Sequence, residues 1–192
     1  MGAGKSTLVD FLCRRFGIRP FYEPNDANPY LPDFYADMQR WALQSQVYFL
    51  TSKFRIHREI AATNETVLQD RTIYEDAEIF AENLYRTGLM PERDYLLYRR
   101  LYETIVESLP PPDLVIYLRC SVRAVRKRIQ LRGRPEEQAV PLAYVRRLHL
   151  LYEEWFARYS ASPTVVIDTE KLDYIQDMVH RLDLLGQIEA IL

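Results

Sequence analysis

The feature that most constrains the fold is the glycine-rich segment at residues 1–7, which reads Met-Gly-Ala-Gly-Lys-Ser-Thr. Its Gly4-Lys5-Ser6 portion matches the second half of the phosphate-binding loop G-x-x-x-x-G-K-[ST]. In such a loop, glycines let backbone N–H groups close around phosphate oxygens, the lysine reaches the terminal phosphates and the hydroxyl binds Mg²⁺. The apolar spacing of residues 7–16 predicts a helix whose positive N-terminal end faces the phosphates. We therefore expect a nucleotide phosphate site built from Gly2, Ala3, Gly4, Lys5, Ser6 and Thr7.

The complete motif also has an earlier part, with a glycine five positions before Gly4 and a β-strand before that glycine. Neither lies within the sequence. We expect about eight further residues upstream, comprising one strand and the first half of the loop. Because such a strand is usually central, a chain without it would lose stability as well as phosphate binding.

Predicted strands and helices alternate along the rest of the chain. Short apolar segments predict strands at 19–23, 65–70, 113–119 and 164–168. Amphipathic spacing predicts helices at 32–62 in one or two pieces, 72–87, 91–109, 121–131, 141–159 and 172–192. This alternation predicts a doubly wound α/β fold. A length of 192 residues, 48% of them apolar, suits one domain over 1–192 with a three-layer core.

The composition argues against several other classes of protein. A net charge of −2 disfavours bulk nucleic-acid binding, and no apolar run is long enough to span a membrane. No signal peptide is visible. Cys13 and Cys120 are predicted to be free, buried thiols in a reducing cytoplasm, and the 3 histidines do not cluster as zinc ligands do.

Charged residues end two of the predicted strands. Pro24 holds Glu23 in an extended conformation, and Asp70-Arg71 closes the strand at 65–70. The carboxyl ends of parallel strands face the ligand crevice, where Glu23 would accept a proton and Asp70 would approach Mg²⁺. The alternatives are a loop carboxylate exposed to solvent and a surface ion pair.

Two further patterns leave alternatives open. Gln46 and Lys53 are seven residues apart, so they lie on one helix face. Gln46 is either an amide that is hydrogen-bonded within the core or a side chain that hydrogen-bonds the polar edge of a ligand. Residues 119–134 hold seven basic side chains and no acidic one, which fits a solvated helix face, a nucleic-acid patch or an arginine lid with a Gly-Arg-Pro hinge. We favour the lid, because arginines there neutralise charge on a transferring phosphoryl group.

A further apolar stripe lies in the helix predicted at 91–109. It comprises Leu97, Leu101, Ile105 and Leu109, and it indicates either a core face or a dimer interface.

Together these motifs resemble the deoxynucleoside kinase family of deoxyadenosine, deoxyguanosine and deoxycytidine kinases. The resemblance covers nearly the whole chain and is carried by GAGKST, Glu23-Pro24, Trp41–Gln46, Asp70–Phe80 and Leu131–Gln138. It implies a P-loop kinase of three layers, α/β/α, with a parallel sheet of about five strands. It also implies an arginine-rich lid over about 128–138, ATP with Mg²⁺, a cytoplasmic location and a homodimer formed through long helices.

The resemblance further implies a role for each candidate residue. Glu23 matches the carboxylate that accepts the 5′-hydroxyl proton, and Arg71 matches the arginine that holds that carboxylate and the 5′-oxygen. Lys5 contacts the phosphates, while Ser6 and Asp70 lie at the metal. Gln46 reads the base edge and Phe80 stacks on the base. The remaining matches are Tyr35 and Glu137 at the 3′-hydroxyl, Lys53 and Asp76 beside the base, and the lid arginines Arg128, Arg132 and Arg134.

The charged pair beside the base bears on substrate choice. An aspartate near Gln46 offers an acceptor to an exocyclic amine, which adenine and cytosine carry and thymine lacks. We therefore expect deoxyadenosine as the substrate, with deoxyguanosine or deoxycytidine as alternatives. Ser45 departs from the bulkier apolar residue of relatives, and its small size either leaves room for a purine or has no consequence.

Two rival functions remain at this level. A nucleoside monophosphate kinase of the thymidylate kinase type shares the loop, the Asp-Arg pair and a lid. Its acceptor phosphate would be repelled by Glu23 and Glu137. The second rival is an inactive P-loop protein that only binds, which the incomplete loop motif suggests; against it, every other catalytic position is filled.

Overall fold

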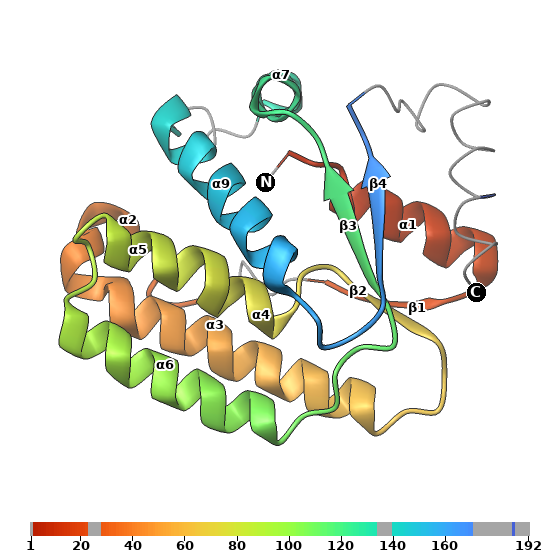
Figure 1. Ribbon diagram of the computed structural model, residues 1–192, viewed down its shortest axis with the longest axis horizontal. Coiled ribbons are helices and arrows are strands. Elements are labelled where there is room, and N and C mark those ends of the chain that lie inside the picture. The colour runs from red at the N-terminus through yellow and green to blue at the C-terminus, as the bar shows by residue number, and fades with distance from the viewer. Residues whose placement is uncertain (1, 23–27, 134–139, 171–185, 187–192) are drawn as a thin grey trace.

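The computed structural model describes residues 2–22, 28–133, 140–170 and 186. Figure 1 shows the strands between helix α1 on one side and α9 with the α3–α6 layer on the other. The helices are α1 Lys5–Phe16, α2 Leu31–Ala36, α3 Met38–Ala61, α4 Ile73–Glu75, α5 Glu82–Arg86, α6 Glu92–Glu107, α7 Val122–Arg132 and α9 Leu142–Arg158. A π-helical segment, η2 Asp76–Ala81, joins α4 to α5. The strands are β1 Arg19–Phe21, β2 Val67–Gln69, β3 Val115–Arg119 and β4 Thr164–Asp168.

The four described strands form two parallel pairs. β1 pairs with β2, so that Arg19 lies opposite Val67, and β3 pairs with β4, so that Val115 lies opposite Thr164. Parallel pairing confirms the α/β prediction. The single sheet expected from the sequence is, among the described residues, divided between β2 and β3.

The largest core lies in the helical layer and not between the strands. Leu50 of α3, Ile79 of η2 and Tyr98 of α6 are completely buried there, and Trp155 of α9 closes the same cluster. A smaller core joins α1 to the second strand pair through Leu8, Leu12, Leu118 and Ile167. α1 is thus fixed against the strands by its apolar face, which positions the loop at its N-terminus.

Local signals set the helix ends close to where the sequence places them. Asp37 caps α3 by accepting a hydrogen bond from the backbone N–H of Arg40, and Ser121 caps α7 by accepting one from Ala124. Caps of this kind stabilise a helix by about 1 kcal/mol each. The helix predicted at 32–62 is two helices, α2 and α3, because Asp37 starts the second one.

Other sequence expectations have mixed outcomes. Both cysteines are free, although Cys13 is only partly buried. Leu97 and Leu101 of the predicted α6 stripe are exposed, and Tyr98 and Tyr102 supply the buried face instead. The helix predicted at 172–192 lies outside the described residues apart from residue 186. Among the helices described, none is long and apolar enough to cross a membrane.

A buried histidine makes the stability of this fold depend on pH. His57 of α3 lies within hydrogen-bonding distance of the Pro110 carbonyl oxygen, 2.9 Å from Nε2, so that Nε2–H donates. Burial lowers the pKa of His57 below its ordinary value, and the bond to Pro110 opposes that shift only in part. The folded protein therefore holds a neutral ring at a pH where the unfolded chain has bound a proton.

Because the unfolded state binds the extra proton, the unfolding free energy should fall as pH decreases from about 7.5 to 5.5, by at most about 1.4 kcal/mol per pH unit from this residue. Denaturant unfolding of the wild-type protein and His57→Gln at both pH values measures the contribution. The wild-type protein should lose more stability than the variant, and His149→Gln should behave as wild type. Equal losses in the wild type and His57→Gln would contradict this role.

Candidate active site

The phosphate loop precedes α1 in a conformation that glycine makes accessible. Gly2 and Gly4 have φ angles of 67° and 94°, in the left-handed region that other residues rarely adopt. A Cβ on Gly2 would also stand 3.0 Å from the Val125 carbonyl oxygen of α7. Lys5 begins α1, so the loop presents its lysine together with the N–H groups of the first helical turn. This arrangement suits an anionic ligand.

A hydrogen bond joins the loop to the end of β2. Ser6 Oγ donates to Asp70 Oδ2 at 2.6 Å, and Asp70 is only 7% exposed. The other carboxylate oxygen, Oδ1, is buried and has no hydrogen-bond partner among the described residues. A hydroxyl and a carboxylate are hard oxygen donors of the type that Mg²⁺ binds, and the ion usually takes its other ligands from water and substrate phosphates. Ser6 and Asp70 therefore fit the expected metal position. Among the described residues no group of three or more acidic, histidine or cysteine side chains offers a competing metal site.

Arg71 follows in an unusual backbone conformation. Its φ of 64° makes it the one non-glycine residue with positive φ in the described part of the chain. A left-handed non-glycine residue costs about 1–3 kcal/mol and persists where surrounding contacts fix it. Here Thr72 and Glu75 form a reciprocal capping box that holds the next turn. The turn aims the Arg71 guanidinium over the Phe80 ring, 4.9 Å from its centre.

Asp76 and Phe80 lie on the π-helical segment η2 and not on a regular α-helix. A π-turn inserts an extra residue and shifts the side chains that follow, which is why such segments are frequent at functional sites. The sequence predicted a regular helix at 72–87 with both residues on one face. The structure retains the helix but changes its internal geometry at these two residues.

A buried ion pair links α3 to η2. Lys53 Nζ lies 3.1 Å from Asp76 Oδ1, and the two side chains are 1% and 4% exposed. Lys53 also donates to the Thr72 carbonyl oxygen at 3.4 Å, which ties the pair to the turn after Arg71. Gln46 is buried two turns earlier on α3, and its Oε1 has no hydrogen-bond partner among the described residues. A buried amide oxygen without a hydrogen-bond partner costs folding free energy. This favours the interpretation in which Gln46 accepts a hydrogen bond from a ligand over the one in which it is a satisfied core amide.

Ser45 takes part in a buried hydrogen bond that neither of the two sequence interpretations, room for a purine or no consequence, predicted. Its side chain is completely buried and accepts a hydrogen bond from Asn28 Nδ2 at 3.2 Å. Asn28 is itself buried, and its Oδ1 accepts from the Tyr30 backbone N–H at 3.0 Å. The small residue therefore anchors the segment that follows residues 23–27 to α3, directly beside Gln46.

The remaining candidate residues are less closely grouped. Tyr35 lies on α2 and is 60% exposed. Arg128 donates to the Thr169 hydroxyl at 3.2 Å and to the Thr169 carbonyl oxygen, so in this structure it binds the end of β4. Arg132 is the last residue of α7, where the described part of the predicted lid ends at residue 133. Glu23, Arg134 and Glu137 lie outside the described residues.

Tyr144 of α9 is a residue that the sequence did not single out, and it packs against the largest core. Burial raises its pKa to about 12, with a further contribution from Tyr35, while Arg71 opposes the shift. A tyrosine on the inward face of an amphipathic helix is the only signal the sequence offers, and it does not distinguish a site residue from a core residue.

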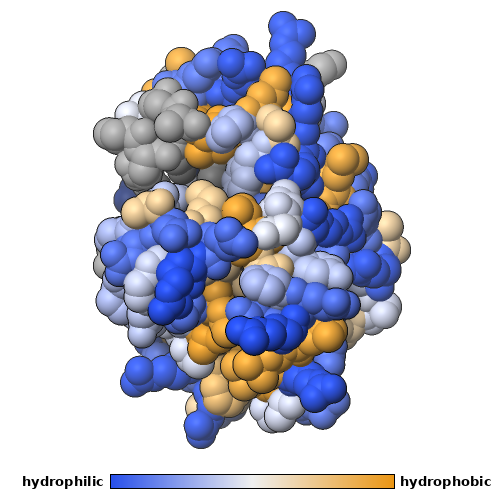
Figure 2. All heavy atoms as spheres, turned by 90° about the vertical axis from the view of Figure 1, so that its left-hand side faces the viewer, coloured by the Kyte–Doolittle hydropathy of each residue, from blue (hydrophilic) through white to orange (hydrophobic). Residues whose placement is uncertain are grey.

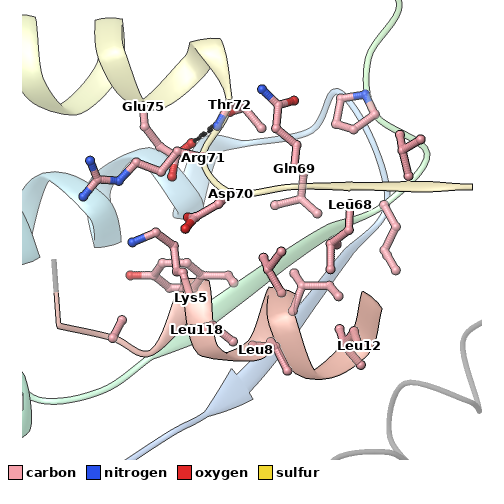
Figure 3. A pocket seen from close by; sticks show the side chains of 18 of the residues that line it. Lys5, Leu8, Leu12, Leu68, Gln69, Asp70, Arg71, Thr72, Glu75 and Leu118 are labelled. Atoms are coloured by element: carbon pink, nitrogen blue, oxygen red, sulfur yellow. Dashed lines mark hydrogen bonds between the residues drawn. The ribbon is translucent and has the colours of Figure 1, made fainter. Parts of the chain in front are cut away.

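Lys5, Asp70 and Arg71 line a cavity of about 770 Å³, which Gln46, Lys53, Asp76 and Phe80 do not line. Figure 3 shows Lys5, Asp70 and Arg71 at one end, with Leu8, Leu12 and Leu118 along the rest of the cavity. Phosphate-loop lysine, strand-end aspartate and strained arginine thus converge at the carboxyl end of β2, as expected for an open α/β sheet.

Comparison with known proteins is consistent with this geometry. The family model described as deoxynucleoside kinase matches residues 1–192. A deoxyadenosine/deoxycytidine kinase of Bacillus subtilis is 35% identical, over 100% of this chain and 89% of that protein. A deoxyguanosine kinase of Lactobacillus johnsonii is 38% identical, over 99% of this chain and 88% of that protein. The solved structure of M. mycoides deoxyadenosine kinase with bound dCTP has a TM-score of 0.81 and 30% identity, over 100% of this chain and 96% of that one.

The sequence match extends over every element that builds the site, and the fold of the solved relative matches the arrangement of those elements. With the phosphate loop, the Asp-Arg strand end and the buried pair beside Gln46 all within the matched region, the chain belongs to the deoxynucleoside kinase family, whose members are ATP-dependent transferases.

Proposed function

We propose that this kinase transfers the γ-phosphoryl group of ATP to the 5′-hydroxyl of deoxyadenosine, with deoxyguanosine and deoxycytidine as alternative acceptors. The observation that supports this most directly is the buried Lys53–Asp76 pair, whose lysine lies on the same α3 face as the buried Gln46. Relatives named for deoxyadenosine, deoxycytidine and deoxyguanosine support the same range. Neither the monophosphate kinase nor the inactive binding protein is favoured by these relatives.

The donor phosphates would lie in the loop at residues 2–7. Its backbone N–H groups and Lys5 hold the β- and γ-phosphates, and arginines of the lid at about 128–138 approach from the other side. Arg128, Arg132 and Arg134 are the lid residues in this proposal. Ser6 and Asp70 would hold Mg²⁺, which when bound neutralises charge on the phosphates.

The acceptor hydroxyl would lie between Glu23 and Arg71. In the transfer, a bond forms between the 5′-oxygen and the γ-phosphorus, and the bond from that phosphorus to the bridging oxygen breaks, so that ADP leaves. The hydroxyl proton passes to the Glu23 carboxylate. Because the transition state is loose, positioning and charge neutralisation contribute more to the rate than the base does. Tyr35 and Glu137 would hold the 3′-hydroxyl.

The nucleobase would lie between Phe80 and the face of α3 that carries Gln46. Asp76 Oδ1 is already bonded to Lys53, which orients the carboxylate. A carboxylate oxygen at that position would accept from the exocyclic amine of adenine or cytosine, whereas thymine presents a carbonyl oxygen there. The Gln46 amide then completes the recognition, since it provides one donor group and one acceptor.

We further propose that residues 1–192 form one kinase domain that acts in the cytoplasm as a homodimer. Leu96, Leu97 and Leu101 of α6 are 51%, 59% and 37% exposed and face away from the core. Figure 2 shows apolar side chains gathered on the lower part of one end of the molecule, the region where α6 lies. A helix face of this kind is a suitable seam for a second copy.

Substitution of the proposed base provides the first test. Glu23→Gln should lower kcat for deoxyadenosine by about 10²-fold or more, because the 5′-hydroxyl loses its proton acceptor. The Kd for ATP, measured by calorimetry, should stay within about twofold, because the phosphate loop is unchanged. Glu107→Gln, on the exposed end of α6, is the matched control and should be fully active. Near-normal turnover by Glu23→Gln would refute the assignment.

The buried pair provides a test of base selection. Asp76→Asn should lower kcat/KM for deoxyadenosine at least about tenfold while thymidine changes little, because one acceptor oxygen becomes a donor. The unfolding free energy should fall by about 3 kcal/mol, since Lys53 keeps an uncompensated buried charge. Asp113→Asn is the exposed control. Equal losses for both nucleosides would show that the pair is structural and does not select the base.

The α6 face provides a test of assembly. Leu97→Glu combined with Leu101→Glu should convert the dimer to a monomer in analytical ultracentrifugation at micromolar concentration, because the seam would then bury two carboxylates per copy. Leu131→Glu, a comparable exposed leucine on α7, should remain dimeric. A wild-type protein that sediments as a monomer, or a double variant that still dimerises, would contradict this seam.

A further inference from the structure

The π-helical segment η2 carries a carboxylate that the proposed mechanism does not use. Glu78 lies in the middle of η2, two residues after Asp76 and two before Phe80. Side chains two residues apart on a helix do not face each other, so Glu78 points away from Asp76. η2 packs against α3, α6 and α9, and Figure 1 shows the segment between α4 and α5 lying among these helices. Glu78 therefore belongs to a different face of η2 from the one proposed to contact the nucleobase.

Two arginines from two different helices bind the Glu78 carboxylate. Arg99 Nη1 of α6 donates to Oε1 at 2.7 Å, and Arg158 Nη2 of α9 donates to Oε2 at 2.7 Å. The Glu78 side chain is 15% exposed, while Arg99 is 24% and Arg158 57% exposed. Short hydrogen bonds between charged groups are stronger than those between neutral ones. Each carboxylate oxygen thus has its own cationic partner, and Glu78 links η2 to α6 and α9 at once.

Ion pairs consequently hold η2 on two faces. Asp76 pairs with Lys53 of α3, whereas Glu78 pairs with the arginines of α6 and α9. A segment that is bound on one face alone can rotate about that contact, but contacts on two faces fix its rotation about the helix axis. This matters in a π-helical segment, because a return to α-helical register would rotate Phe80 relative to Asp76. The stacking of Arg71 on the Phe80 ring depends on the same rotation.

We propose that Glu78 is a positioning residue for base recognition. Its ion pairs with Arg99 and Arg158 fix the rotation of η2, so that Asp76 and Phe80 present their side chains together to the nucleobase. The inference rests on the proposed function, in which those two residues contact the base. Glu78 does not line the cavity at the phosphate loop, and it acts on the substrate only through η2.

The alternative is that these ion pairs only stabilise the packing of α6 and α9 on η2. Ion pairs that water reaches contribute little to the free energy of unfolding, which leaves orientation as the more important effect. Arg99 also approaches a second carboxylate, since its Nη2 lies 3.5 Å from Glu103 Oε1. That contact joins two residues of α6 and does not reach η2. Glu103 therefore offers a matched control that changes the charge beside Arg99 and leaves the link to η2 intact.

Steady-state kinetics of Glu78→Gln test the proposal. The amide keeps the shape of the side chain but has one acceptor oxygen in place of two, so one arginine loses its partner. The KM for deoxyadenosine should rise at least about fivefold, and the preference for deoxyadenosine over thymidine in kcat/KM should fall at least about threefold. The kcat at saturating deoxyadenosine and the KM for ATP should stay within about twofold, because the phosphate loop is unchanged.

Further variants show whether the effect passes through the contact with α9. Glu103→Gln should leave all four kinetic quantities unchanged. Arg158→Met should resemble Glu78→Gln, whereas Arg158→Lys, which keeps a cation, should retain most of the preference for deoxyadenosine. The double variant Glu78→Gln with Arg158→Met should be no worse than the more impaired single variant, because both substitutions break the same contact. Arg158 is largely exposed, so its variants also serve if Glu78→Gln is not recovered folded.

Two results would overturn the proposal. One is a lower melting temperature of Glu78→Gln with an unchanged KM and an unchanged preference, which would show a purely structural ion pair. The other is an equal rise of KM for deoxyadenosine and for ATP, which would show a general distortion of the enzyme. Asp76→Asn separates this inference from the proposed function. If only Asp76→Asn reduces the preference, the role of Glu78 alone is wrong, and if neither variant does, base recognition by η2 is wrong as well.

Discussion

The arrangement of the site depends on the hydrogen bond from Ser6 to Asp70. It spans 64 positions of sequence and joins the first turn of α1 to the residue that follows β2. Because Ser6 lies in the phosphate loop and Asp70 follows the strand, this contact would set where the donor phosphates of the proposed site lie relative to the strand ends. Arg71 directly follows Asp70 and has a left-handed backbone. In the proposed site, phosphate binding and acceptor binding would therefore share this junction.

The nucleoside end of the site is stabilised in a different way. α3 carries Gln46 and Lys53 on one face, and η2 brings Asp76 against that face as a buried ion pair. A buried ion pair contributes little more to stability than the apolar residues that could replace it. Under the proposed function, the pair would instead serve to recognise the polar edge of the nucleobase. Asn28 and Ser45 add a second anchor, so the segment that leads from residues 23–27 is attached beside Gln46.

The sequence predicted those elements that are determined by residues close together in the chain. The loop at residues 2–7 and the parallel strands followed from glycine and apolar patterns. The sequence could not indicate which stripe of α6 is buried, because leucines at 97 and 101 and tyrosines at 98 and 102 are both periodic. The π-helical turn at Asp76 and the hydrogen bonds from Arg128 to Thr169 arise from tertiary contacts. Nothing in the residues around β2 and β3 indicates that the described strands form two separate pairs.

We propose that this family member phosphorylates deoxynucleosides that carry an exocyclic amine. The most direct measurement is ATP-dependent phosphorylation of the four deoxynucleosides together with dAMP and dTMP by the chain of 192 residues. We predict that deoxyadenosine, deoxyguanosine or deoxycytidine is converted to its 5′-monophosphate at least about tenfold more efficiently than thymidine, because of Asp76 and Gln46. Turnover of the monophosphates alone, or a preference for thymidine, would contradict it.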